Sequence, residues 1–360
     1  RPVFHTGPFS NLVLAGLRQM SDSAHGHDGL AAHGIEVVHR RALALDPERR
    51  TLRLADDSVI GFRKAILSPG IDMRWNALPG YDAVAAETMP HAWKAGPQTA
   101  LLRRQLEAMA DGDTVIIVPP DNPFRCPPGP YERASLIAHW LQRHRPRSKV
   151  LILDAKDGFS KQALFRQGWA ALYPGLIEHV RATDDGRIVT VNAAEGWVES
   201  AFGTRHAAAV INVIPPQWAG AIARDAGLVN ADGWCPVDPV TFASDMAADV
   251  HVIGDAAVAG QMPKSGFSAN SQGKVAAANI VHALAGRDPV AGSFANTCYS
   301  LVGPEHGISV AKVYRSTPAG IVGIDGSGGL SPMDAGAAVR AHEAAFAEGW
   351  YASITSDMFG

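Results

Sequence analysis

Between residues 97 and 154 the chain alternates helical stretches with short apolar runs. Apolar and charged residues alternate at helical spacing from Pro97 to Ala110, and the apolar run 114–118 follows. A second helical stretch, 131–143, leads to a second apolar run, 150–154. Buried parallel strands joined by a helix have this pattern, so we predict a βαβ unit here.

Shorter runs rich in β-favouring residues lie on both sides of this unit. Before it, three runs separated by turn residues predict a small meander, at 35–38, 51–54 and 65–67. After it, the pattern predicts a helix from Phe159, alternating strands around the turn 184–186 and a strand at 208–214. The sheet of an α/β domain is therefore expected to continue to about residue 214.

The two ends of the chain have different patterns. The opening residues carry Gly and Pro without a clear period, which predicts a loop and then a short helix. After Gly292 the pattern predicts strands at 297–302 and 308–314, a glycine-rich turn at 326–329 and a helix over 335–350. The C-terminal part is therefore predicted to be a separate α+β domain.

The stretch 250–284 places an acid between a strand and a helix. Val250 to Ile253 predict a strand, which Gly254 and Asp255 end, and a small-residue helix is predicted from about Ser268. A carboxylate at a strand tip can accept hydrogen bonds from ligand hydroxyls, while the N-H groups of the helix face an anion. A turn followed by an ordinary helix start is the alternative interpretation.

Composition excludes several classes of function. The net charge is −3 and only 19% of the residues are charged, so nucleic acid and anionic membrane surfaces are poor partners. No apolar stretch is long enough to span a membrane. His25 and His27 have metal-compatible side chains but no third ligand nearby, so we predict no metal site. Arg1 is not an initiator Met, and the chain is expected to begin inside a longer one.

The turn after the first strand of the βαβ unit is unsuited to a dinucleotide. It reads PPDNPFRCPPGPYE from Pro119 to Glu132, with five prolines before Gly129. Proline has no N-H group and blocks close approach, so this turn cannot hold a pyrophosphate as a glycine-rich turn does. The sequence argues against NAD at this site. The prolines instead hold one thiol, Cys126, at a fixed place.

Cys126 is the strongest chemical candidate, with a buried structural thiol as the alternative. Taken alone, Cys298 and Cys235 favour structural positions. Glu132 stands in the first turn of the predicted helix, where it can reach over the loop or simply favour the helix dipole. Lys264 can stabilise an anion at the ligand face or lie solvated on the surface. The strand that ends at Pro69 and Gly70 brings backbone close to a neighbouring element or a cofactor.

Five motifs together resemble one family. They are FRCPPGPYERAS (124–135), GWCPVD (233–238), VIGDA (252–256), MPKSGFSANSQGKVAAA (262–278) and NTCYS (296–300). This set is similar to the flavoprotein subunit of flavocytochrome c sulfide dehydrogenase, a glutathione-reductase-like family of FAD/NAD-linked reductases.

The resemblance implies an α/β chain with two Rossmann-like three-layer domains and a C-terminal α+β interface domain. The implied boundaries are an FAD-binding domain at 1–80 and 221–290, a nucleotide-fold domain without an NAD motif at 81–220, and the interface domain at 291–360. The family's N-terminal βα unit, which carries G-x-G-x-x-G for the ADP half of FAD, is expected to be missing. A periplasmic location is implied, which suits a stable disulfide.

The resemblance also implies the site. Cys126 and Cys298 correspond to a redox disulfide beside the flavin, Glu132 to a nearby acid–base group and Asp255 to a ribityl ligand. The other implied or predicted cofactor-binding residues are Gly254, Lys264, Ser265, Gly266, Pro69, Gly70 and Trp350. The family's flavin-linking cysteine is replaced by Gly7, so FAD is expected to bind without a covalent link.

The implied function is the oxidation of sulfide, with electrons passed to a c-type cytochrome subunit. Two alternatives remain. One is an enzyme that resembles sulfide:quinone oxidoreductase, although the ending lacks the amphipathic membrane-dipping helix that such an enzyme needs. The other is a flavin-free relative that serves only as a cytochrome-binding or structural subunit.

Overall fold

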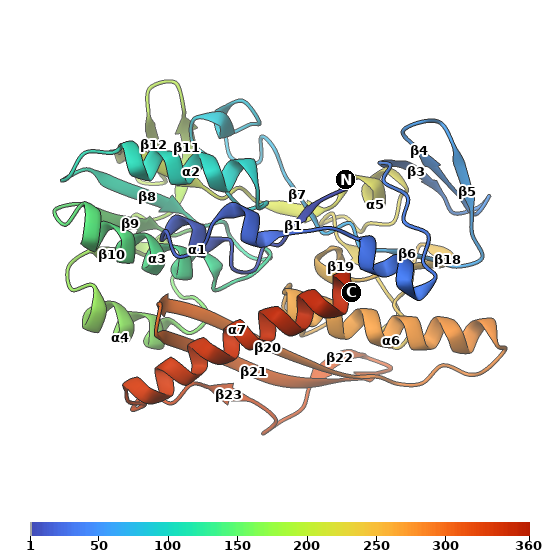
Figure 1. Cartoon of the computed structure of the whole chain (residues 1–360). Helices are drawn as coiled ribbons and strands as arrows, with labels where there is room; N and C mark the ends of the chain where they lie inside the picture. The colour runs from blue at the N-terminus through green and yellow to red at the C-terminus, as the bar shows by residue number, and fades with distance from the viewer. Residues whose placement is uncertain (1) are drawn as a thin grey trace.

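A parallel four-stranded sheet lies on the left in Figure 1, which draws the computed structural model; the structure describes residues 2–360. The strand order is β10–β9–β8–β14. The bounds are Thr114–Val118 for β8, Lys149–Leu153 for β9, Ile177–Val180 for β10 and Val210–Val213 for β14. The predicted βαβ unit is confirmed, because β8 and β9 are parallel and α3 (Gly129–His144) joins them. The α/β fold class is confirmed as well.

Helix α3 is buried along most of its length. It contacts β9 and β10 of the parallel sheet and also β20 (Ser293–Gly303) of the C-terminal region. Side chains all around the helix are therefore buried, including those at successive positions from Arg133 to Leu141. Helix α2 (Pro97–Ala108) contacts β14 of the sheet, and α4 (Gln162–Leu172) contacts α3 and β20. Because α3 is enclosed, its N-terminal turn lies inside the molecule.

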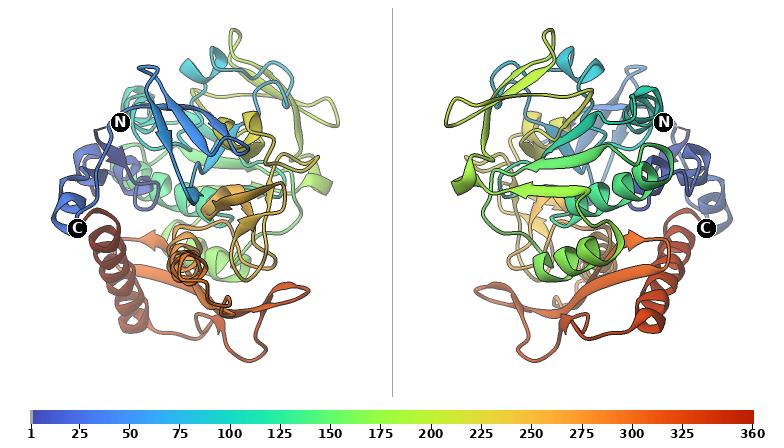
Figure 2. Two further views of the ribbon diagram at one scale, coloured as in Figure 1. Left: turned by 90° about the vertical axis from the view of Figure 1, so that its right-hand side faces the viewer. Right: turned by 90° about the vertical axis from the view of Figure 1, so that its left-hand side faces the viewer.

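The C-terminal region forms a layer of its own (Figure 2). It is an antiparallel sheet of β20, β21 (His306–Thr317), β22 (Gly320–Gly323) and β23 (Gly329–Leu330). Helix α7 (Ala337–Phe359) contacts β21 and β20, and α6 (Gly266–Leu284) contacts β20. The predicted strands and helix are present, but α7 continues past Trp350 to Phe359.

The N-terminal segment lies against the end of α7. Strand β1 (Phe4–His5) pairs with β2 (Ala24–His25), and the short helix α1 (Asn11–Leu14) lies between them in sequence. The rings of Phe4 and Phe359 have centroids 5.8 Å apart. The predicted opening loop and short helix are confirmed.

One predicted strand of the N-terminal meander is wrong. Residues 35–38 form no strand, and Ile35 and Val38 are 50% and 43% exposed. The strand is instead β3 (Ala42–Asp46), where Leu45 is buried and Leu43 faces outward. It pairs with β4 (Thr51–Leu54), which pairs with β5 (Val59–Gly61). Of the two apolar runs, only the second has a partner strand and a buried face. These two features decide which run becomes a strand.

The strand and helix predicted around Asp255 are both present. β18 (Ala247–Val252) runs parallel to β6 (Ala65–Leu67) and antiparallel to β17 (Ala243–Ser244). Gly254 then turns the chain at φ +75°, and α6 begins at Gly266 with Ser265 as its N-cap. This order brings the strand tip, the acid and the helix start together.

Smaller pieces complete the fold. An antiparallel sheet consists of β11 (Ile188–Asn192), β12 (Trp197–Ser200) and β13 (Arg205–Ala207). Two further pairs are β7 (Ile71–Met73) with β15 (Gln217–Ala219), and β16 (Cys235–Pro236) with β19 (Ala257–Val258). The short helix α5 (Ala221–Asp225) follows β15. Within residues 2–360 no helix is long and apolar enough to cross a bilayer.

Candidate active site

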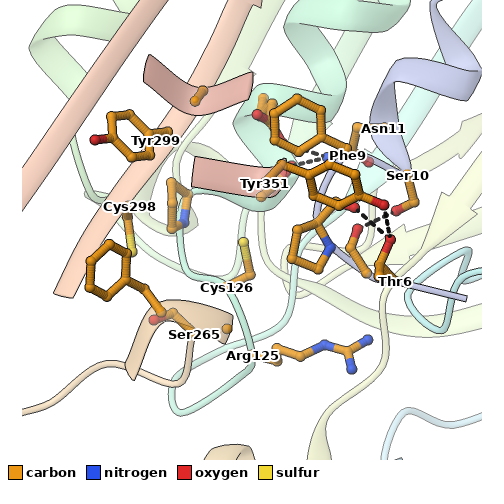
Figure 3. Close-up of a pocket in the computed structure, with 18 of the residues that line it drawn as sticks. Thr6, Phe9, Ser10, Asn11, Arg125, Cys126, Ser265, Cys298, Tyr299 and Tyr351 are labelled. Atoms are coloured by element: carbon orange, nitrogen blue, oxygen red, sulfur yellow. Dashed lines mark hydrogen bonds between the residues drawn. The ribbon is translucent and has the colours of Figure 1, made fainter. Parts of the chain in front are cut away.

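A cavity of about 240 Å³ lies where the N-terminal segment, the proline-rich loop, the start of α6, β20 and α7 meet (Figure 3). These segments are far apart in sequence, and each contributes side chains to the lining. Its walls include both Cys126 and Cys298, together with Glu132 and Asp255. The structure therefore brings the main sequence-predicted site residues to one cavity.

Cys126 is held by its backbone in a left-handed conformation. Its φ is +57°, its N-H donates to the carbonyl oxygen of Lys264 over 2.8 Å, and its own carbonyl accepts from Gly129 N-H over 2.8 Å. A Cβ at position 129 would lie 3.1 Å from Cys126 Sγ and 2.7 Å from the ring of Trp93. Glycine is thus required beside the sulfur by space rather than by backbone conformation.

The second thiol, Cys298, comes from β20 and also lines the cavity (Figure 3). All three cysteines are thiols in residues 2–360, so the predicted bridge between Cys126 and Cys298 is not formed in this structure. Burial raises the pKa of Cys126 to about 12, and Cys298 and Glu132 add to the effect. Cys235 lies in the core, fully buried.

Glu132 faces the cavity from the first turn of α3. Its Oε2 accepts from Asn11 Nδ2 over 2.9 Å, and its Oε1 accepts from the N-H of Leu301 over 2.9 Å. Burial raises the pKa of this carboxyl, against the hydrogen bonds, which lower it. Its hydrogen-bond partners belong to the N-terminal segment and β20 rather than to the proline-rich loop, so the side chain reaches across the fold, which neither sequence interpretation describes.

Asp255 presents an unpaired oxygen. Its side chain is 14% exposed, and Arg125 Nε lies 4.0 Å from Oδ2. Oδ1 is buried and has no hydrogen-bond partner within the described residues. Burial raises the pKa of this carboxyl, while Arg125 and Lys264 lower it. Since an unpaired buried acceptor is costly, the arrangement suits a ligand that brings a donor, such as a hydroxyl.

The side chain of Lys264 lies neither at the ligand face nor on the solvated surface, the two positions expected from the sequence. Its ammonium donates to the carbonyl oxygens of Asp255 (2.7 Å) and Ala257 (3.0 Å) and lies 3.8 Å from the centroid of the Trp234 ring. Burial lowers the pKa of Lys264 to about 8. Two backbone oxygens satisfy the amine, and Lys264 is not among the residues that line the cavity, so it supports the turn at Asp255 rather than facing a ligand.

Pro69 and Gly70 also lie outside the cavity lining. The amide of Gly220 donates to the carbonyl oxygen of Gly70 over 3.0 Å, and a Cβ at position 220 would lie 2.7 Å from the carbonyl oxygen of Pro69. The close approach of backbone is therefore to a neighbouring element. Gly254 also lies outside the cavity lining. Its N-H donates to Gln272 Oε1 over 2.8 Å, which fixes the turn before Asp255.

Three predicted residues, Ser265, Gly266 and Trp350, line the cavity. The Trp350 ring stacks with Phe267, with centroids 6.1 Å apart and an interplanar angle of 5°. Gly7, the position of the family's linking cysteine, lines the cavity too. Aromatic and aliphatic side chains dominate these walls, which suits a flat ring with a few polar edges.

Sequence reasoning missed the polar side chains that support this site. Arg133 is 2% exposed and donates to Asn11 Oδ1 (3.0 Å), Asn212 Oδ1 (2.8 Å) and the carbonyls of His91 (3.0 Å) and Ala92 (2.6 Å). Burial lowers its pKa to about 9. Its position within the motif 124–135 was the only available signal, because its partners come from distant segments.

Two more missed residues lie beside Cys298. Lys161 is 5% exposed, and its ammonium donates to the carbonyl oxygen of Cys298 over 2.7 Å. Asn296 is 3% exposed, and its Nδ2 donates to Cys298 Sγ over 3.4 Å. Within residues 2–360 no group of three or more His, Cys, Asp or Glu side chains is placed to hold a metal ion.

The fold is similar to those of two solved oxidoreductases. The sulfide:quinone oxidoreductase of Aquifex aeolicus is similar with a TM-score of 0.69 and 13% identity, over 98% of this chain and 83% of that one. A NAD-dependent persulfide reductase from A. fulgidus is similar with a TM-score of 0.61 and 14% identity, over 97% and 69% of the two chains.

Two ranges of the chain match one protein family. Residues 99–215 match the central part of the sulfide dehydrogenase (flavocytochrome c) flavoprotein chain, and residues 290–359 match the flavin-binding part described for flavocytochrome c sulphide dehydrogenase. The two ranges together span just over half of the chain. The chain belongs to this family, as its sequence motifs predict.

A curated relative is the mitochondrial sulfide:quinone oxidoreductase of Mus musculus, 22% identical over 278 residues. The alignment covers 69% of this chain and 56% of the mouse protein, so this chain spans little more than half the length of that relative.

Proposed function

We propose that this chain is the flavin-binding subunit of a sulfide-oxidising enzyme and that Cys126 and Cys298 form its redox-active disulfide. One observation carries the proposal: both thiols, one from the proline-rich loop and one from β20, line the same cavity. Glu132 and Asp255 line it with them. Membership of the flavocytochrome c sulfide dehydrogenase family supports the substrate class.

The residues of the cavity fit FAD as the cofactor. Asp255 Oδ1, buried and unpaired within the described chain, would accept a hydrogen bond from a ribityl hydroxyl. Trp350 and Phe267 offer apolar ring surface beside it. Gly7 carries no side chain that could link to the flavin, so binding is non-covalent. A bound flavin would accept an electron pair and release the electrons singly to a one-electron carrier.

The protein's own residues perform the sulfur chemistry. Hydrosulfide attacks one sulfur of the Cys126–Cys298 bridge, which yields a persulfide on that residue and a thiolate on the other. Glu132 has a raised pKa and a fixed orientation, and it is suited to take the proton from hydrogen sulfide as the nucleophile forms. Both products stay on cavity-lining residues.

The proposed electron acceptor is a c-type cytochrome subunit, and the proposed location is the periplasm. The family description, which names a flavoprotein chain of a flavocytochrome c, supports the partner. A quinone is the second candidate, because the mouse relative is a sulfide:quinone oxidoreductase.

The acceptor is tested with protein reconstituted with FAD under anaerobic conditions. Sulfide is added with either an oxidised c-type cytochrome or a short-chain ubiquinone, and the reduction of each is followed by absorbance. Faster reduction of the cytochrome supports the proposal, and faster reduction of the quinone rejects the cytochrome as the acceptor. A protein that binds no FAD, yet folds and binds cytochrome, would instead be the flavin-free structural subunit.

A further inference from the structure

Arg125 brings a positive charge to the cavity beside Asp255. Its side chain lines the cavity and is 24% exposed, and its Nε lies 4.0 Å from Asp255 Oδ2. This separation is too long for a hydrogen bond, so the two groups attract each other without binding directly. A ligand in the cavity can therefore contact both the guanidinium and the carboxylate.

Arg125 is the cation of the cavity lining that still has donors to offer. The other cationic side chain of the lining is Arg133, which is 2% exposed and donates to four protein oxygens. A guanidinium group has five N-H donors. Within residues 2–360 the side chain of Arg125 donates only to the carbonyl oxygen of Trp93. Its remaining N-H groups are therefore left for a ligand.

The position of this guanidinium is fixed before any ligand binds. Its Nη2 donates to the carbonyl oxygen of Trp93, and the backbone N-H of Arg125 donates to Oε1 of the buried Gln217 over 3.0 Å. The side chain extends away from the sulfur of Cys126 (Figure 3). An anion bound by Arg125 thus lies on the side of Asp255, and a donor held in place in advance loses little freedom on binding.

The two groups together define the chemistry of a ligand. Asp255 Oδ1 is buried and unpaired within the described chain, so it suits a hydroxyl donor. A guanidinium group binds a phosphate through two parallel N-H···O hydrogen bonds. Hydroxyls and a phosphate lie a few bonds apart on the ribityl phosphate chain of a flavin, which suits an acid and a guanidinium 4.0 Å apart.

We propose that Arg125 binds the phosphate at the end of the ribityl chain, so that the cavity selects phosphorylated flavins over riboflavin. The inference rests on the proposed function, because a flavin must occupy the cavity. Asp255 then holds the hydroxyls of the chain, and Arg125 holds the phosphate that follows them. The selection is a matter of binding, and no covalent step is involved.

Three flavins test this assignment in purified protein that has been freed of flavin. Equilibrium dialysis gives the dissociation constants of riboflavin, FMN and FAD. FMN and FAD should bind about 10–100-fold more tightly than riboflavin, the range that hydrogen bonds between charged groups support. Inorganic phosphate should weaken the binding of FMN but not that of riboflavin, compared with sodium chloride at equal ionic strength.

The variant Arg125→Gln separates phosphate binding from folding. The glutamine has no charge, so the preference for FMN over riboflavin should fall to about threefold or less, while the affinity for riboflavin stays the same. The matched control is Arg103→Gln. The side chain of Arg103 is 20% exposed and donates to the carbonyl oxygen of Leu14 over 2.7 Å, but it does not line the cavity, so this variant should keep the wild-type preference.

The outcomes distinguish the inference from the proposed function. Equal affinity of the wild type for riboflavin and FMN, or an unchanged preference in Arg125→Gln, overturns the inference and leaves the proposed function standing. If Arg125→Gln does not fold, the competition experiment decides, and equal effects of phosphate on both flavins overturn the inference. Failure of the wild type to bind any of the three flavins rejects the proposed function and the inference with it.

Discussion

The backbone N-H of Cys126 donates a hydrogen bond to the carbonyl oxygen of Lys264 over 2.8 Å. This contact joins the proline-rich loop after β8 to the segment before α6. It places one candidate redox sulfur against the turn that carries Asp255, although the two lie more than a hundred positions apart in the sequence. The prolines stiffen the loop, and this bond sets where the sulfur lies.

Replacing Gly129 with Ala should displace Cys126 and destabilise the protein by about 1–3 kcal/mol, because the new methyl group would overlap the Trp93 ring. Urea unfolding measures the change in free energy. Gly349→Ala is the matched control, since this exposed position of α7 has open space and the change should stabilise by about 0.5–1 kcal/mol. Equal effects of the two substitutions would show that the contact beside Cys126 has no cost.

Asp255→Ala should weaken FAD binding by about 10–100-fold, because a buried acceptor for the cofactor is lost. The protein without FAD should be no less stable, and should gain about 1 kcal/mol or less, because the unpaired buried carboxyl is removed as well. Fluorescence titration with FAD and urea unfolding measure the two effects. Asp357→Ala removes an exposed carboxylate paired with Lys274 and should leave FAD affinity unchanged. A loss of stability without a loss of affinity would contradict the ligand role of Asp255.

His91 should make the protein sensitive to mild acid. Burial, with Arg133, lowers its pKa from 6.5 to about 3, and its Nδ1 accepts from the N-H of Trp93 over 2.9 Å. Between these two values the unfolded chain binds the proton and the folded chain does not. The free energy of unfolding therefore falls as the pH falls below 6.5, by about 1.4 kcal/mol per pH unit from this group.

The variant His91→Asn keeps an acceptor for Trp93 N-H but does not titrate. Its free energy of unfolding, measured in urea at pH 7, 6 and 5, should decline less steeply than that of the wild type. Parallel pH profiles for the two proteins would show that His91 is not the group responsible.

Local patterns were sufficient to predict the βαβ unit and the strand–acid–helix order at Asp255. Continuous apolar runs specify buried strands, and Gly254 with Asp255 marks the end of one. The strand at 35–38 was wrong because an apolar run alone does not provide a partner strand. Ala42–Asp46 has that partner in β4, and pairing decides which run becomes a strand.

The residues of the candidate site that lie in recognisable motifs were predicted from the sequence. Those whose roles depend on tertiary contacts were missed. Cys126, Cys298 and Glu132 have recognisable sequence surroundings, and all three line the cavity. The side-chain direction of Lys264 could not be predicted from the neighbouring residues, because the fold brings together the carbonyl oxygens and the Trp ring that contact its amine. Asn296 was missed for the same reason, since its contacts are with the hydroxyls of Ser265, the N-cap of α6, and of Ser268 within that helix.

Anaerobic addition of sulfide to the FAD-reconstituted protein tests the central claim most directly, with bleaching of the flavin absorbance as the readout. Cys126→Ser and Cys298→Ser should each abolish the bleaching, because neither can form the bridge that hydrosulfide opens. Cys235→Ser, which changes a core thiol outside the cavity lining, should retain it. Undiminished bleaching in Cys126→Ser would contradict the account.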